Sequence, residues 1–170
     1  DLHVRSDGLD DLRRLQRVHP PLELDPGAAF ARMQLPPARR FHATDVLRMA
    51  DGLRREVILL GFSSVSDSLQ FTRCVPGTLL RHLQYGCWVV QGLWEEVEGE
   101  PEAWEERAFF DPKDFRPDPT DDPEYAAARQ RLFETKRVRA GETLHFVDAR
   151  ESARAAAVHH RLTGWADAWR

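Results

Sequence analysis

The residues of this chain that could take part in catalysis do not form any of the common catalytic motifs. The sequence contains no P-loop, no dinucleotide-binding Gly-x-Gly-x-x-Gly, no His-Glu-x-x-His zinc motif and no Gly-x-Ser-x-Gly nucleophile elbow. Schiff-base chemistry needs a desolvated lysine, and Lys113 and Lys136 are the two lysines of the chain. His159 and His160 are adjacent on a predicted helix, where neighbouring side chains point about 100° apart and cannot readily share a ligand.

Two stretches resemble the sequence motifs of the cupin superfamily, whose small β-barrels often hold a metal in a histidine-rich cage. The stretch 76–92 is similar to the first motif and contains His82, and the stretch 138–146 looks like the second and contains His145. The resemblance implies a barrel with a divalent metal, Fe, Zn, Ni or Mn, bound by His82 and His145. It also implies a metal-dependent enzyme, or a sensor of a small-molecule ligand such as a thiol, an acid or a sugar.

The cupin resemblance is partial at the positions that would bind the metal. The family's paired His-x-His is here His82-x-Gln84, and its motif-one glutamate falls at Tyr85. Because a divalent metal needs three or more ligands, one of the two adjacent histidines near the C-terminus would have to supply the third. An alternative interpretation is a short helix over 78–85, which the spacing of its three leucines favours and in which His82 would be a surface residue.

A second resemblance, to ADP-ribosyltransferase-type domains, begins at residues 40–44 (Arg-Phe-His-Ala-Thr) and continues to Gly52-Leu53. Ser64-Val-Ser66 and Glu96-Val-Glu98 look like two further motifs of one branch of these enzymes. The resemblance implies an NAD-using enzyme in which Arg40 binds the dinucleotide phosphates and a glutamate stabilises an oxocarbenium-like state. The alternative is an ordinary capped helix and a glutamate-rich strand end.

Negative charge is concentrated in one segment. Residues 95–124 carry 13 acidic side chains against three basic ones, whereas the whole chain has a net charge of −4, so the remainder is mildly basic. This asymmetry favours a basic protein partner and opposes nucleic-acid phosphate, so a nucleic-acid partner is not expected. Four prolines and six acids predict an exposed loop over 111–124. The alternative is a solvated segment that only keeps the protein in solution.

The predicted partner-binding residues are of two kinds. Carboxylates of the acidic loop would steer encounters with a basic partner, and two tryptophans spaced i, i+4 near the C-terminus would anchor it. These residues are Asp114, Asp118, Asp121, Asp122, Trp165 and Trp169. The sequence therefore favours a non-catalytic binding or regulatory module, with a cupin-like metal protein and an ADP-ribosyltransferase-like enzyme as the alternatives.

Length and composition set the class of protein. The chain has 170 residues, 42% of them hydrophobic, which is enough for the core of one domain. No apolar run approaches the roughly 20 residues of a membrane span, so no membrane association is expected. Cys74 and Cys87 are flanked by apolar residues, which predicts buried thiols and a reducing, cytoplasmic compartment. Arginine-heavy, alanine-rich composition suggests a bacterial source.

Apolar periodicity, caps and breakers predict the elements that must position these residues. Helices are expected over 7–19, 45–53 (capped by Thr44), 125–133 and 150–162, strands over 56–62, 68–75, 87–97 and 104–110, and a hairpin over 137–147. Without a regular β-α-β alternation, we expect the α+β class: an antiparallel sheet or small β-barrel with flanking N- and C-terminal helices. Residues 1–37 would form an N-terminal helix and proline-rich arm, and 38–170 a single α+β domain with the acidic loop 95–124.

Overall fold

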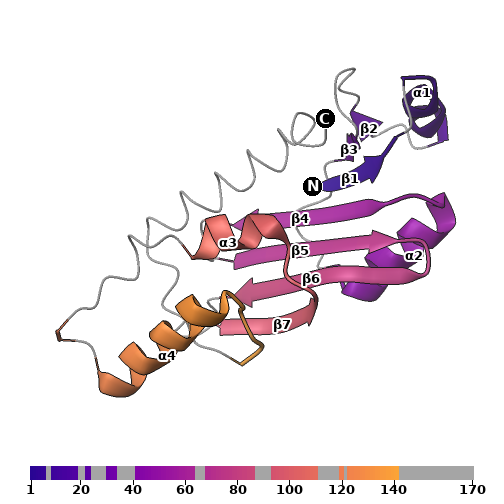
Figure 1. Ribbon diagram of the computed structural model, residues 1–170. Helices are drawn as coiled ribbons and strands as arrows, with labels where there is room; N and C mark the ends of the chain where they lie inside the picture. The colour runs from indigo at the N-terminus through magenta and orange to yellow at the C-terminus, as the bar shows by residue number, and fades with distance from the viewer. Residues whose placement is uncertain are drawn as a thin grey trace.

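The fold is an open antiparallel sheet with helices on both faces (Figure 1). The computed structural model describes residues 1–6, 9–18, 22–23, 30–33, 41–63, 68–86, 93–110, 119–120 and 122–141. Their strands are β1 (Leu2–Arg5), β2 (Leu22–Glu23), β3 (Phe30–Met33), β4 (Val57–Ser63), β5 (Ser68–Val75), β6 (Thr78–Gly86) and β7 (Leu93–Gly99). Their helices are α1 (Leu9–Val18), α2 (Ala43–Leu53), α3 (Ala103–Phe109) and α4 (Pro123–Thr135).

The described strands lie in the order β2-β3-β1-β4-β5-β6-β7, with β2 and β7 at the two edges. This confirms the α+β class and the antiparallel sheet, and the described strands do not close into a barrel. Strands β4 to β7 form a meander, because each is paired antiparallel with the next. No helix within the described ranges is long and apolar enough to cross a membrane.

The two faces of the sheet carry separate apolar clusters, as expected when strand side chains alternate. On one face, Phe71 and Leu83 are fully buried with aromatic and aliphatic residues that include Trp94, Phe110 and Leu132. On the other face, a cluster containing Val57 and Cys74 packs against α2. Figure 1 shows α3 and α4 in front of the sheet and α2 behind it.

The thiol of Cys74 is buried, as the sequence predicted. Burial, together with the charge of Asp51, raises the pKa of this thiol to about 11, so it stays protonated at neutral pH. Cys87 lies outside the described residues.

Strand β5 has the predicted bounds, and β4 is shifted by one residue. The helix interpretation of 78–85 is wrong, because β6 pairs with β5 on one side and β7 on the other. Pairing with β5 along most of the strand, and with β7 from Arg81 to Gly86, satisfies its backbone, and this outweighs the helical spacing of its leucines. The sequence did not predict the three short strands β1, β2 and β3 within residues 1–37.

The predicted strand over 104–110, and its hairpin partnership with the preceding strand, are wrong. The chain leaves β7 through Gly99 and Pro101 and enters α3 instead. A local contribution comes from Glu102 and Glu105, which form a capping box that satisfies amides at the start of the helix.

Two further expectations need correction. Helix α2 is capped by His42, with Asp45 as its capping-box partner, and not by Thr44, which lies inside the helix. The described part of the predicted hairpin, 137–141, is not a strand but ends in a turn, where the Gly141 amide donates to the Trp94 carbonyl at 2.8 Å. The predicted C-terminal helix over 150–162 lies outside the described residues.

The turn between β7 and α3 generates the first prediction. Gly99 has a φ of 79°, and a Cβ there would lie well inside van der Waals contact of the Leu80 carbonyl oxygen on β6. We expect Gly99→Ala to lower the free energy of unfolding by about 3 kcal/mol or more, because a backbone clash adds to the left-handed strain. Gly77 has a similar φ of 76° but open space around it. Gly77→Ala should therefore cost only about 1–2 kcal/mol. Equal losses in denaturant titrations of the two variants would contradict this account.

Candidate functional site

A cluster of paired charges in the described structure is built around two arginines on neighbouring strands. Arg73 on β5 and Arg81 on β6 are directly opposite in the sheet register, on the same face as Phe71 and Leu83. Like charges placed opposite each other across two strands are destabilising, so this pair needs carboxylates close by. The need is greatest for Arg81, which is 1% exposed.

Glu105 on α3 supplies the carboxylate for Arg81. The Arg81 Nε donates to Oε1 at 2.9 Å and Nη2 donates to Oε2 at 2.7 Å, which is a bidentate pair. Both side chains are 2% exposed. The Nη1 atom of Arg81 also donates to the carbonyl oxygens of Glu98 and Gly99. The guanidinium therefore joins β6, the end of β7 and α3.

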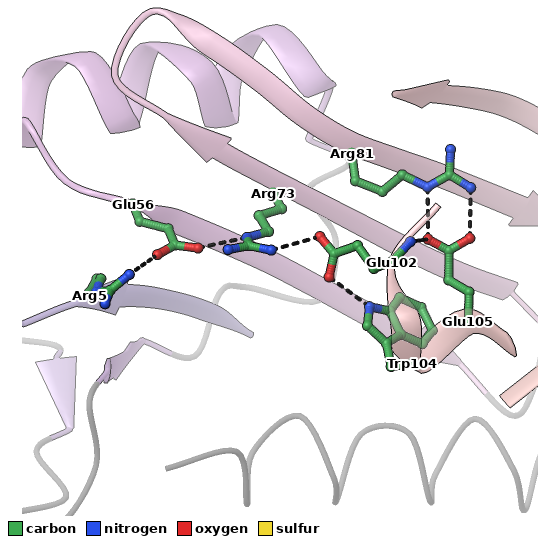
Figure 2. Close-up of polar contacts among 7 residues, drawn as sticks. All are labelled: Arg5, Glu56, Arg73, Arg81, Glu102, Trp104 and Glu105. Atoms are coloured by element: carbon green, nitrogen blue, oxygen red, sulfur yellow. Dashed lines mark hydrogen bonds and ion pairs between the residues drawn. The ribbon is translucent and has the colours of Figure 1, made fainter. Parts of the chain in front are cut away.

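Arg73 lies between two carboxylates, as Figure 2 shows. Its Nε donates to Glu56 at 2.6 Å and its Nη1 donates to Glu102 at 3.1 Å. Glu56 also accepts a hydrogen bond from Arg5 on β1 at 2.9 Å. Burial of Arg73 acts to lower its pKa, but the charges and hydrogen bonds of Glu102 and Glu56 outweigh it and hold the pKa above its ordinary value. The arginine is therefore a fixed positive charge.

Helix α3 is tied to this network by its own capping residues. The Glu102 amide donates to Oε1 of Glu105, the same oxygen that accepts from Arg81. The Trp104 indole donates to Glu102 at 2.9 Å, and its ring meets Phe71 edge to face with centroids 5.0 Å apart. We call Arg5, Glu56, Arg73, Glu102, Arg81 and Glu105 the arginine–glutamate network; its three positive and three negative charges balance (Figure 2).

The predicted metal ligand His82 lies on β6, on the opposite face from the arginine–glutamate network. Its side chain is completely buried, its Nδ1 is 2.9 Å from the Thr72 hydroxyl, and its Nε2 is 3.0 Å from a carboxylate oxygen of Glu96. Both ring nitrogens thus have partners within the protein. His145 lies outside the described residues, and no group of three or more metal-ligating side chains is present among the described ones.

Other residues of the two family resemblances are also placed. Gln84, which stands where the cupin pattern has its second histidine, donates to Glu95 on β7. Of the transferase-like residues, Glu96 binds His82, while Glu98 is exposed on the same strand. Arg40, Ser64 and Ser66 lie outside the described residues, so the NAD-using role stays a prediction.

Of the predicted partner-binding residues, the structure describes Asp122. It is exposed, and its carboxylate accepts a hydrogen bond from the Glu124 amide at 2.9 Å, so it caps the start of α4. The others, Asp114, Asp118, Asp121, Trp165 and Trp169, lie outside the described residues, as does most of the predicted loop 111–124.

The structure divides the acidic segment 95–124 in a way that sequence reasoning missed. Glu102 and Glu105 turn inward to the two arginines. The signal was present as a pair of glutamates three residues apart after Pro101, which is the pattern of a capping box. Others face solvent: Glu96 has a side chain 46% exposed and Glu100 one 83% exposed, and Glu98, Glu106 and Glu124 are exposed as well.

Comparison with known proteins found no matching family, curated protein or solved structure.

The second prediction contrasts two adjacent glutamates of α3. Glu105→Gln keeps the side-chain size but leaves the buried Arg81 charge without its carboxylate, and should lower the free energy of unfolding by about 3 kcal/mol. Glu106→Gln removes the same charge from an exposed position, so stability should change by no more than about 0.5 kcal/mol. Chemical denaturation of both variants measures the difference. A similar, small effect of both changes would show that the Arg81–Glu105 pair does not hold the fold.

Proposed function

We propose that this protein is a non-catalytic binding module that engages a basic protein partner through the outward carboxylates of the acidic segment. The division of that segment carries the proposal. Glu102 and Glu105 pair with Arg73 and Arg81. Glu96 and Glu98 lie two residues apart on one face of β7, Glu100 directly follows the strand, and all three are exposed. Carboxylates spaced in this way suit arginine or lysine side chains of a partner.

A contact inside the chain supports this chemistry. Arg137, which follows α4, donates to Glu100 at 2.9 Å while both side chains remain largely exposed. A guanidinium can therefore reach the exposed carboxylate that follows β7. In the proposal, Asp114, Asp118, Asp121 and Asp122 extend the acidic surface and Trp165 and Trp169 supply apolar anchors.

In the described part of the chain, the polar side chains around His82 and in the arginine–glutamate network are bonded to one another, which also favours a binding role over a catalytic one. The His82 imidazole uses both nitrogens inside the sheet, and the arginine–glutamate network balances its own charges. A general acid or base needs a group within reach of substrate, and Thr72 and His82 are 0% exposed.

The third prediction tests the acidic surface. Exposed side chains rimming an interface mainly steer association, so Glu98→Gln with Glu106→Gln should slow partner association severalfold and flatten its salt dependence, with a smaller effect on dissociation. Proteins captured from a lysate by the immobilised chain would be identified by mass spectrometry and purified, and association rates measured by surface plasmon resonance.

The matched control is Asp10→Asn with Glu134→Gln, which makes the same change in net charge at exposed positions outside the acidic segment. This control should bind at the wild-type rate. Equal rates for wild type and both double variants, or equal slowing by both, would remove the acidic segment as the partner surface.

The fourth prediction separates this proposal from the cupin-like alternative. A metal at His82 would have to displace Thr72 or Glu96 from a ring nitrogen, so we expect purified protein to stay metal-free after incubation with Fe, Zn, Ni or Mn. The cupin-like alternative instead expects about one metal per chain, lost in His82→Ala and in His145→Ala. Elemental analysis by mass spectrometry decides between the two, and stoichiometric metal would favour the metalloprotein.

A further inference from the structure

Helix α3 is a short element whose flanking residues on both sides contact the rest of the fold. At one end, Gly99 lies against the β6 backbone, and at the other, Phe110 is 2% exposed within the main apolar cluster. The helix has seven residues, fewer than the about 12–15 that an isolated helix needs to be even marginally stable in water. Its helical state therefore depends on docking against the sheet.

The docking of α3 relies heavily on charge. Glu102 and Glu105 reach the two arginines, and Trp104 adds an edge-to-face contact with Phe71. Separating a buried ion pair returns both ions to water, and their regained hydration offsets much of the lost attraction. The electrostatic cost of opening the helix as a unit is therefore lower than that of deleting one partner, which would leave a charge buried alone.

Opening would leave an unbalanced positive site on the sheet. Without Glu102 and Glu105, the guanidinium groups of Arg5, Arg73 and Arg81 would share the single carboxylate of Glu56, an excess of two positive charges beside the Phe71 ring. Guanidinium groups match the geometry of carboxylate and phosphate oxygens, so the complement of this site is a small dianion.

We propose that α3 is a carboxylate latch over an anion site: Glu102 and Glu105 occupy the Arg73–Arg81 pair, and a small phosphate-type dianion competes with them and opens the helix. A ligand that binds the open state alone shifts the equilibrium toward it. The site lies on the face of the sheet away from His82 and does not rest on the proposed protein partner.

The fifth prediction is a test by hydrogen exchange on the intact chain. Amide exchange would be compared in inorganic phosphate and in sodium chloride at matched ionic strength and pH. We expect the amides of α3 to exchange about threefold faster or more in phosphate, with those of β4 and β5 no faster. Phosphate ordinarily strengthens folded proteins and slows exchange, so acceleration confined to α3 is the opposite of its general effect.

Two variants make the test specific. Arg73→Gln removes one guanidinium from the site, and its α3 amides should exchange no faster in phosphate than in sodium chloride, whatever their absolute rate. Arg137→Gln removes an exposed arginine outside the site and should keep the full phosphate response. The proposal is overturned if wild-type α3 exchanges equally in the two salts, if α3 and the sheet accelerate together, or if Arg73→Gln keeps the response.

Discussion

The direct opposition of Arg73 and Arg81 across β5 and β6 is the constraint on which much of this structure depends. Two guanidinium groups facing the same side of a sheet, one of them almost completely buried, are tolerable only with carboxylates in contact. The chain supplies them from two directions, Glu56 before β4 and the pair Glu102 and Glu105 on α3. Satisfying these charges holds α3 against the sheet, where Trp104 packs on Phe71.

The same constraint explains how one acidic segment serves two purposes. Carboxylates that pair with the partly or fully buried arginines lose hydration and are fixed by geometry, whereas exposed carboxylates such as that of Glu98 keep their hydration. Neighbouring residues fall on different sides of this division: Glu105 is buried and Glu106 is exposed. Net charge over the segment therefore overstates the charge that a partner would meet.

The opposite face of the sheet carries a row of hydrogen-bonded polar side chains. Thr72 and His82 are directly opposite each other, both without solvent exposure, and Glu96 completes a hydrogen-bonded row across three strands. Because each ring nitrogen of His82 has a partner, Thr72 and His82 can be buried at little cost, and the row links β6 to both β5 and β7. A histidine in a motif-like stretch is thus also compatible with a structural role in strand pairing.

The local sequence pattern correctly predicted those elements whose conformation is set by residues close to them in the chain. The alternation of apolar and polar residues predicted both ends of β5, and an apolar stripe predicted a helix at α2. The overall order of elements indicated an α+β sheet protein. The local pattern gave the wrong prediction where residues distant in the sequence decide the conformation or the burial of a side chain. The leucines of 78–85 fit a helix until β5 and β7 pair with that stretch, and Glu102 and Glu105 read as solvated loop charges until the fold brings Arg73 and Arg81 beneath them. Burial of a charge depends on the position of its counter-charge, here at least 24 residues away along the chain, and spacing within a short window carries no information about it.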